Sequence, residues 1–300
     1  MVDVGSRSAT EEAGPEILTL GGAPLEVQFI PALGGRLHRL RAFGVDLLRT
    51  PSSTAAHVTD PYFWGGYVMA PWCNRVGTGP RLVGGRTVDL APGFPDGTAI
   101  HGQVATVPWI QLDNGTLAVH GGGSGWPWAY EVTQRVSVAG STLALDLAVT
   151  NRSDAVMPAG LGLHPWFVTP IEIAVAARRV VPMNTDPAAG AEAVAGRYDL
   201  RRLGNPPDDL DGTWLDLDDP AVRLSWPDRG LEATLRARSS AAIAVAVATP
   251  SGAGAVAIEP QTHAPWGLRR FVAGDPDGLV ALEPGASLKL AIEIQFRRAG

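Results

Sequence analysis

The chain of 300 residues lacks several features that would assign it to a broad class of protein. Its single cysteine, Cys73, can form neither an internal disulfide nor a multi-thiolate metal site, which fits a reducing compartment. No run of eighteen uncharged apolar residues occurs, and the N-terminus has no apolar segment behind a basic start. We therefore expect a soluble, unexported protein of the cytoplasm that has no membrane partner.

Long runs of one charge are also absent. The 24 basic and 30 acidic residues give a formal net charge of −6 and are spread along the chain. This balance offers no electrostatic footprint for a polyanion, so nucleic acid is not an expected partner. Hydrophobic residues make up 45% of the chain and charged residues 18%, which is enough for a sizeable core in a folded protein.

Spacings typical of metal and nucleotide sites are missing as well. The six histidines never occur as His-x-x-x-His and there is no Cys-x-x-Cys, so we expect no metal. The glycine-rich run at residues 121–125 lacks a Walker lysine and precedes a strand-like segment, which favours a loop or hairpin over a phosphate site. No βαβ pattern is present, so we expect no nucleotide cofactor.

Alternation of apolar and polar residues recurs from end to end of the chain. Residues 130–138, 143–149 and 288–296 alternate at period two, as half-buried strands do. The 36 glycines and 25 prolines leave little room for long helices. Residues 243–248 are apolar on both faces, which indicates a central strand covered on each side. These patterns predict an all-β fold, a large sandwich or barrel.

The domain organisation that we expect is simple. No linker of low complexity separates two halves, so we predict one domain over residues 16–300 after a loose N-terminal tail at residues 1–15. Residues 178–205 carry no sustained period and contain several prolines and glycines, which predicts a loop with one short helical turn near residues 190–194. Edge strands of a sandwich can pair, so monomer and homodimer both stay open.

Two titratable residues, His164 and Glu259, stand in apolar segments and are each followed by a proline. If they face one pocket, an imidazole and a carboxylate form a general acid and a general base, the pair needed to open and close a sugar ring. Each alone has a simpler structural interpretation. A His-Pro step is more often a turn with a satisfied imidazole, and Glu-Pro dipeptides commonly end strands at the surface.

Further polar residues stand beside an aromatic, a glycine or a proline where strands are expected to end. They are Asn74, Arg75, His101 and Asp211. Aromatic faces stack on sugar rings, while these polar groups can bond vicinal hydroxyls. Taken singly, Arg75 could close a surface ion pair, Asp211 could form a turn and His101 could mark a loop corner.

Taken in order, these segments resemble the aldose 1-epimerase (galactose mutarotase) family from about residue 32 to the C-terminus. The resemblance rests on Gly34–Leu37, Met69–Arg75, Ile100–Gly102, Trp126–Trp128, Val149–Asn151, Met157–Phe167, Leu210–Asp211, Glu259–Thr262 and Leu282–Gly285. It implies a galactose mutarotase-like β-supersandwich with few short helices. It also implies a cofactor-free isomerase that interconverts the α and β anomers of an aldohexose.

The same resemblance implies a role for each residue. Glu259 is the expected base for the C1 hydroxyl, and His164 is the expected acid for the ring oxygen. The C1–O5 bond then breaks, rotation about C1–C2 exposes the other carbonyl face, and the reverse steps close the ring. The expected substrate-binding residues are Asn74, Arg75, His101, Asp211 and Trp166. Trp166 stands where the family often has tyrosine, so it keeps a stacking surface without a phenolic hydroxyl.

Two alternatives stay open. An epimerase of a phosphorylated or sulfonated hexose would need extra cations at the pocket rim. The candidates are Arg81, Arg178, Arg179, Arg201, Arg202, Arg269 and Arg270. A non-catalytic carbohydrate-binding protein on the same fold could dispense with either His164 or Glu259, whereas this chain has both.

Overall fold

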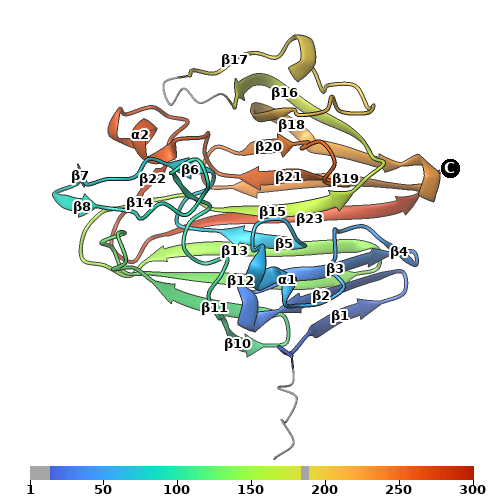
Figure 1. Cartoon of the computed structure of the whole chain (residues 1–300), viewed down its shortest axis with the longest axis horizontal. Helices are drawn as coiled ribbons and strands as arrows, with labels where there is room; N and C mark the ends of the chain where they lie inside the picture. The colour runs from blue at the N-terminus through green and yellow to red at the C-terminus, as the bar shows by residue number, and fades with distance from the viewer. Residues whose placement is uncertain (1–13, 184–188) are drawn as a thin grey trace, which may run out of the picture.

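Nearly all regular structure in the computed structural model, which describes residues 14–183 and 189–300, is β-strand (Figure 1). The strands are β1 (Leu18–Gly22), β2 (Leu25–Ile30), β3 (Arg36–Ala42), β4 (Val45–Asp46), β5 (Gly66–Met69), β6 (Arg75–Val76), β7 (Arg81–Val83), β8 (Arg86–Val88), β9 (Ala99–Ile100), β10 (Ile110–Asp113), β11 (Thr116–Gly121), β12 (Tyr130–Ala139), β13 (Thr142–Asn151), β14 (Met157–Ala159), β15 (Gly162–Val168), β16 (Glu172–Pro182), β17 (Glu192–Ala193), β18 (Asp211–Trp226), β19 (Leu231–Ser239), β20 (Ala244–Ala248), β21 (Ala255–Gln261), β22 (Val280–Leu282) and β23 (Ser287–Arg298). The helices are α1 (Ala56–Thr59) and α2 (Gly267–Val272), with 3-10 turns η1 (Pro31–Leu33), η2 (Gly196–Tyr198) and η3 (Pro227–Arg229). The predicted all-β class with few short helices is confirmed.

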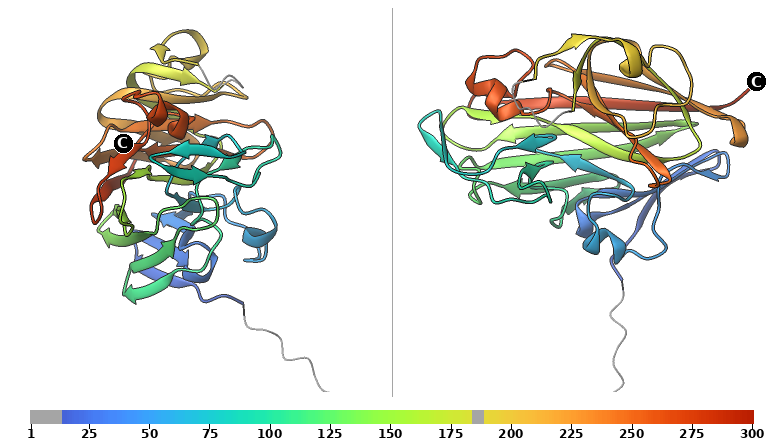
Figure 2. Two further views of the ribbon diagram at one scale, coloured as in Figure 1. Left: turned by 90° about the vertical axis from the view of Figure 1, so that its left-hand side faces the viewer. Right: turned by 45° about the horizontal axis from the view of Figure 1, so that its top comes forward.

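Two series of antiparallel pairs form the two layers of the molecule (Figure 2). One series runs β1, β2, β3, β5, β15, β21, β20 and β18. The other runs β10, β11, β12, β13, β23, β19 and β18. The sixteen residues of β18 connect the layers, because its first half pairs with β20 and its second half pairs with β19.

The main core lies on one face of the first layer, and the alternation of each strand decides which side chains enter it. On β15, Leu163 and Phe167 belong to the main core, while His164 and Trp166 take the opposite face. Each fully buried Leu or Phe contributes roughly 2 kcal/mol by leaving water. The face opposite the core is therefore where the polar residues of these strands lie.

Strand β20 shows the same division with smaller side chains. Val245 and Val247 are part of the main core, whereas Ala244, Ala246 and Ala248 occupy the opposite face. The strand lies between β18 and β21, as a central strand does. The prediction for residues 243–248 is confirmed, and the strands expected at residues 130–138, 143–149 and 288–296 are β12, β13 and β23.

The prediction for residues 178–205 is wrong in two places. Strand β16 continues to Pro182 where a loop was expected, because it stays paired with β18 up to Gly212. The short helical turn lies at η2 (Gly196–Tyr198) and not near residues 190–194. Residues 190–194 instead contain strand β17, which pairs with β16. Arg178 and Arg179 interrupt the apolar pattern of β16 because they pair with aspartates of β18, a contact that the local sequence does not show. Residues 184–188 lie outside the described residues.

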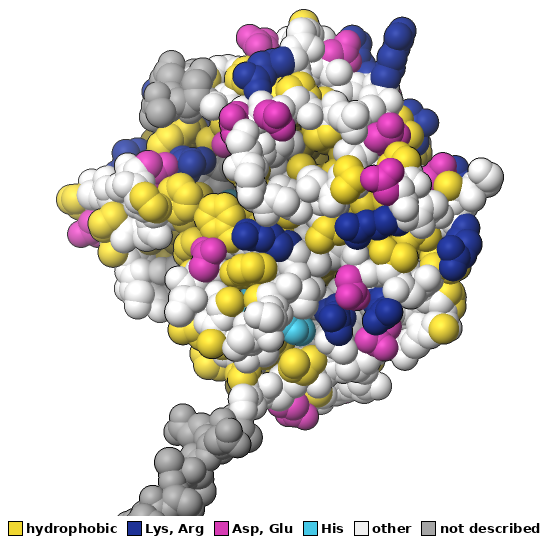
Figure 3. Space-filling view, turned by 45° about the vertical axis from the view of Figure 1, so that its right-hand side comes forward, with side chains coloured by type: hydrophobic (Ala, Val, Ile, Leu, Met, Phe, Trp, Pro, Cys, Tyr) yellow, Lys and Arg dark blue, Asp and Glu magenta, His cyan; other side chains and the backbone are white. Residues whose placement is uncertain are grey.

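Two further expectations concern the ends of the chain and membranes. Residues 1–13, which make up most of the expected N-terminal tail, lie outside the described residues. Within residues 14–183 and 189–300, neither α-helix is long and apolar enough to cross a membrane. Acidic and basic side chains are intermixed on the face that Figure 3 shows.

Candidate active site

His164 and Glu259 are 95 positions apart in the sequence (259 − 164) but lie side by side in the sheet. His164 on β15 pairs with Tyr67 on β5, and the register of β15 with β21 places Glu259 in the same row. The row continues through Ala246 on β20 to Thr213 on β18. Because opposed residues of antiparallel strands share a face, this row across five strands lies on one face of the sheet, and Tyr67, His164 and Glu259 of the row line the same cavity.

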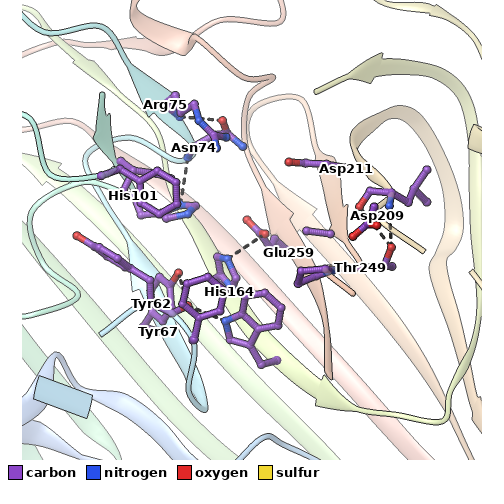
Figure 4. Close-up of a pocket in the computed structure, with 17 residues that line it drawn as sticks. Tyr62, Tyr67, Asn74, Arg75, His101, His164, Asp209, Asp211, Thr249 and Glu259 are labelled. Atoms are coloured by element: carbon purple, nitrogen blue, oxygen red, sulfur yellow. Dashed lines mark hydrogen bonds and ion pairs between the residues drawn. The ribbon is translucent and has the colours of Figure 1, made fainter. Parts of the chain in front are cut away.

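A cavity of about 310 Å³ opens over this row (Figure 4). Its lining includes all seven residues predicted from the sequence: Asn74, Arg75, His101, His164, Trp166, Asp211 and Glu259. The volume lies near the lower end of the range for small-molecule sites, as suits a single sugar ring. The small side chains of β20 leave the space, since Ala248 is also part of the lining.

The imidazole and the carboxyl group are in direct contact at the base of the cavity. His164 Nε2 lies 3.1 Å from Glu259 Oε1, and each side chain is only 5% exposed. The ring of His164 also stacks on Tyr67, with centroids 4.7 Å apart and planes 22° apart. The stack and the contact together fix the imidazole between an aromatic face and a carboxyl group.

Burial acts on both members of this pair. Burial raises the pKa of Glu259 to about 8, an effect that the Asp211 carboxylate increases and Arg75 opposes. Burial lowers the pKa of His164 to about 3, a main-chain hydrogen bond opposes this shift, and the charge of Arg36 adds to it. A neutral carboxyl group beside a neutral imidazole carries as many protons as a carboxylate beside an imidazolium. One proton can therefore change sides across the contact without altering the net charge of the pair.

His101 reaches the cavity from the loop that follows β9. Strand β9 pairs with β6, which brings His101 beside Asn74. The Asn74 N–H donates to His101 Nδ1 at 3.3 Å, and the His101 N–H donates to the Asn74 carbonyl oxygen at 3.1 Å. Burial, followed by the charges of His164 and Arg75, holds the pKa of His101 well below its usual value. Because Nδ1 accepts a hydrogen bond, the neutral ring has its proton on Nε2.

The position of His101 depends on the glycine that follows it. Gly102 has φ +77°, and a Cβ at this position would lie 1.9 Å from the carbonyl oxygen of Ala70. The N–H of the next residue, Gln103, donates to that same carbonyl oxygen at 2.8 Å. Only glycine allows this approach, which explains the His-Gly pair in the sequence.

Arg75 and Asp211 lie on opposite walls of the cavity, as Figure 4 shows. Arg75 Nε donates to Asp96 Oδ2 at 2.6 Å, and its guanidinium lies 5.4 Å from the centroid of the Phe94 ring. Asp211 begins β18, and burial raises its pKa to about 6 against the opposing effect of Arg75. One wall thus presents Arg75, which is paired with Asp96, and the other presents the partly protonated carboxyl group of Asp211.

Sequence reasoning missed the aromatic residues of the lining. Tyr62, Phe63 and Tyr67 all line the cavity, and Phe63 stacks on Trp166 with centroids 5.2 Å apart. The Trp166 indole N–H donates to the Tyr62 carbonyl oxygen at 2.7 Å, which holds the indole ring at the cavity. The signal that could have revealed them is the cluster of aromatics at residues 62–67, immediately before the Met69–Arg75 segment.

A second aspartate at the same wall, Asp209, was also missed. Its carboxylate accepts hydrogen bonds from the N–H and the hydroxyl of Ser251, each at 2.9 Å. Its backbone is left-handed, with φ +50°. Asp209 therefore holds the turn before β18.

Comparison with known proteins places this site in a family. The model of the family described as aldose 1-epimerase matches residues 17–242, most of the chain. The chain belongs to the aldose 1-epimerase family. It is accordingly an epimerase, an isomerase of carbohydrate metabolism. A search of curated proteins found no match to this chain.

Solved structures of similar proteins share the fold. A putative aldose 1-epimerase from Escherichia coli K12 is 21% identical, with a TM-score of 0.80 over 95% of this chain and 100% of that one. An aldose epimerase homologue from C. elegans is 16% identical, with a TM-score of 0.78 over 96% and 100%. Galactose 1-epimerase from Lactobacillus acidophilus NCFM is 16% identical, with a TM-score of 0.75 over 98% of each chain. The predicted galactose mutarotase-like fold is confirmed.

One group of side chains in the described part of the chain has the composition of a metal site. Ligand atoms of His101, His164 and Glu259 lie within 4.8 Å of one another. A metal on His101 Nε2 would require the ring proton to move to Nδ1, where it would face the Asn74 N–H. The group is thus suited to proton transfer and does not fit a resident metal. The absence of a metal stays a prediction.

The buried histidines of the protein predict how its stability responds to acid. Burial lowers the pKa of five of the six, namely His38, His57, His101, His164 and His263. In the unfolded protein the pKa of histidine is near 6.5, and in the folded protein the pKa values of His57 and His263 are about 3 and about 4. Above pH 6.5 these histidines therefore do not destabilise the fold, but as the pH falls toward 3 to 4 the free energy of unfolding decreases. Each proton taken up on unfolding lowers the free energy of unfolding by about 1.4 kcal/mol per pH unit.

We therefore expect the thermal unfolding temperature to fall steeply between pH 6.5 and pH 4.5, as followed by circular dichroism. The raised pKa values of Asp211 and Glu259 act in the opposite direction, but five histidines outweigh two carboxyl groups. His120 is the control, because its side chain is 66% exposed and His120→Gln should leave the slope unchanged. An unfolding temperature that stays constant over this window would contradict the account.

Proposed function

We propose that the protein interconverts the α and β anomers of a neutral aldohexose, with Glu259 as the base and His164 as the acid. The observation that carries this proposal is the contact of 3.1 Å between the two groups at the base of a cavity of about 310 Å³. The hydroxyl and the ring oxygen of a cyclic sugar are bonded to the same carbon, C1. An acid and a base that serve these two oxygens must therefore lie close together, as this pair does.

In the proposed mechanism, the Glu259 carboxylate removes the proton of the C1 hydroxyl while His164 protonates the ring oxygen. The C1–O5 bond breaks and leaves an open-chain aldehyde, and rotation about C1–C2 presents the other face of the carbonyl group. In the reverse step, neutral His164 removes the proton of the O5 hydroxyl as O5 attacks C1, and protonated Glu259 gives its proton to the carbonyl oxygen, which closes the ring with the opposite configuration. His101, which carries its proton on Nε2, supplies a further donor near the ring oxygen.

The charges of the lining support a neutral sugar. None of the seven arginines considered for a phosphate or sulfonate is among the described residues that line the cavity. Several of them are paired with aspartates elsewhere: Arg178 with Asp218, Arg179 with Asp216 and Asp277, Arg201 with Asp199, and Arg270 with Asp275. Arg75 does line the cavity, but Asp96 offsets its charge. A phosphate or sulfonate group on the sugar would instead face the carboxyl groups of Asp211 and Glu259.

A binding protein without catalysis is the weaker alternative. Glu259 is 4% exposed, and its raised pKa reflects the cost of burying a carboxylate. A site that only binds sugar gains nothing from that cost, since an amide would offer hydrogen bonds without it. A buried carboxyl group whose pKa is about 8 is instead suited to exchanging a proton near neutral pH.

The test is a comparison of anomerisation rates on glucose and galactose with those on their 6-phosphorylated and 6-sulfonated counterparts. We expect kcat/KM to be at least about tenfold higher for the neutral sugars than for the charged ones. The phosphate or sulfonate group would face carboxyl groups in the cavity, with no unpaired cation to offset its charge. Asp211→Asn removes one of those charges and should narrow the ratio. Faster turnover of a charged sugar would overturn the assignment of substrate, and binding of neutral sugars without turnover would favour the binding protein.

A further inference from the structure

Arg36 is a buried cation whose hydrogen-bond partners are all uncharged. It is 1% exposed and begins β3. Its Nε, Nη1 and Nη2 atoms donate to the carbonyl oxygens of Leu33, Pro61 and Ala105, each at 2.9 Å. Nη1 also lies 3.2 Å from His57 Nδ1. Burying a guanidinium without a carboxylate partner is costly, so this arrangement calls for an explanation.

Two of these carbonyl groups belong to the segments that carry cavity residues. Pro61 immediately precedes Tyr62, whose own carbonyl oxygen accepts the Trp166 indole N–H at 2.7 Å and the Tyr67 hydroxyl at 3.3 Å. Ala105 ends the short segment that begins with His101. The guanidinium thus joins the loop around α1 to the loop after β9 behind the cavity wall.

The cation also lies against the aromatic ring that supports the acid. The guanidinium carbon of Arg36 is 5.5 Å from the centroid of the Tyr67 ring, and the same ring stacks on His164 at 4.7 Å. His57 orients the other side of the cluster, because its Nε2 lies 2.9 Å from His38 Nδ1 while its Nδ1 faces Arg36. Arg36, Tyr67 and His164 therefore form one continuous stack of contacts.

We propose that Arg36 is a positioning residue for the acid–base pair, whose fork fixes the two loops that carry Tyr62 and His101 and whose charge acts through Tyr67 on His164. The proposal rests on the proposed function of His164 and Glu259. Arginine suits the position because its planar fork binds three carbonyl groups that diverge from one another. Lysine would keep the charge but could not bridge the same three groups.

The charged and titratable groups around the pair come from several elements. They are Tyr67 on β5, Cys73 before β6, Arg75 on β6, His101 after β9, Asp211 on β18 and Arg36 on β3, while Asp60 and Tyr62 act on Arg36 itself. Removing the positive charge of Arg36 favours the protonated forms of the pair and leaves the other five groups in place. Both limbs of the pH profile of kcat/KM should then move to higher pH.

The experiment compares Arg36→Met, which removes fork and charge, with Arg36→Lys, which removes only the fork. For both variants we expect kcat to fall by about 100-fold with little change in KM, because His164 is no longer aligned with the two loops that carry Tyr62 and His101. We expect amide hydrogen exchange to become faster in residues 56–63 and 101–105 specifically. The limbs of the pH profile should shift upward in Arg36→Met and stay in place in Arg36→Lys.

The matched control is Arg229→Met. Arg229 also donates to two carbonyl oxygens, those of Asp46 at 2.8 Å and Thr169 at 3.4 Å, but it is not among the lining residues. This variant should keep the kcat, the pH profile and the exchange of both loops.

Three results would overturn the proposal. The first is an Arg36→Met variant whose kcat is within a few-fold of wild type. The second is an Arg36→Met variant that unfolds at a lower temperature but whose pH profile of kcat/KM has both limbs at the wild-type positions. The third is an Arg36→Lys variant that matches wild type in kcat and exchange, and this outcome decides the question if Arg36→Met does not fold. If the wild type itself lacks mutarotase activity, the proposed function fails, while exchange in the two loops still tests the positioning role.

Discussion

Glu259→Gln is expected to lower kcat for mutarotation by about 10²- to 10⁴-fold, the usual contribution of a general base. Glutamine keeps the size of the side chain and one oxygen beside His164, but it cannot accept the proton of the C1 hydroxyl. The rate is measured by polarimetry on freshly dissolved α-glucose or α-galactose. Glu131→Gln, at a half-buried glutamate outside the cavity, is the control that should keep full activity.

The same variant should change the dependence of stability on pH. The pKa of Glu259 is raised from 4.5 to about 8 in the folded protein, so its favourable contribution is complete below pH 4.5 and is lost as the pH rises through 8. Glu259→Gln removes this loss, and at pH 9 the variant should unfold at a higher temperature than the wild type. Full mutarotase activity in Glu259→Gln would remove this residue from the mechanism.

His164→Ala is expected to lose a similar factor of about 10²- to 10⁴-fold in kcat, because the proposed acid for the ring oxygen is then missing and His101 offers that oxygen only a hydrogen bond. Removing the imidazole leaves a space beside Tyr67 that a small planar molecule can enter. Added imidazole should therefore restore part of the rate, as followed by the same polarimetric assay.

Glu259→Gln provides the control for this rescue, since free imidazole has no vacated ring site in that variant. Activity in His164→Ala equal to that of the wild type would exclude the imidazole as the acid. Equal stimulation of both variants by imidazole would show buffer catalysis in place of rescue.

The part of the site that the sequence predicts is the part that breaks a local pattern. His164 stands between core residues Leu163 and Phe167, and Glu259 follows Ile258, so both are polar interruptions of apolar strands. The register of β15 and β21 then makes them neighbours. Alternation at period two indicates which face each residue takes, but not which strands pair.

The residues that the sequence did not reveal act through contacts between distant segments. Tyr62 and Phe63 lie in a loop without periodicity, and their place in the cavity depends on the Arg36 and Trp166 hydrogen bonds. The end of β16, residues 178–182, was predicted as a loop for a related reason, because the ion pairs of Arg179 with Asp216 and Asp277 join segments that are distant in the sequence. Long-range pairing of this kind overrides local propensity.

The most direct test of the central claim is exchange between the two anomers at equilibrium, measured by proton NMR in D2O with wild-type protein and glucose or galactose. We expect exchange peaks between the α and β H1 signals that grow with protein concentration. We expect no deuterium at C2, since only the C1–O5 bond and exchangeable protons take part in the proposed mechanism. Exchange no faster than in buffer for every neutral aldohexose, or deuterium appearing at C2, would contradict ring opening by His164 and Glu259.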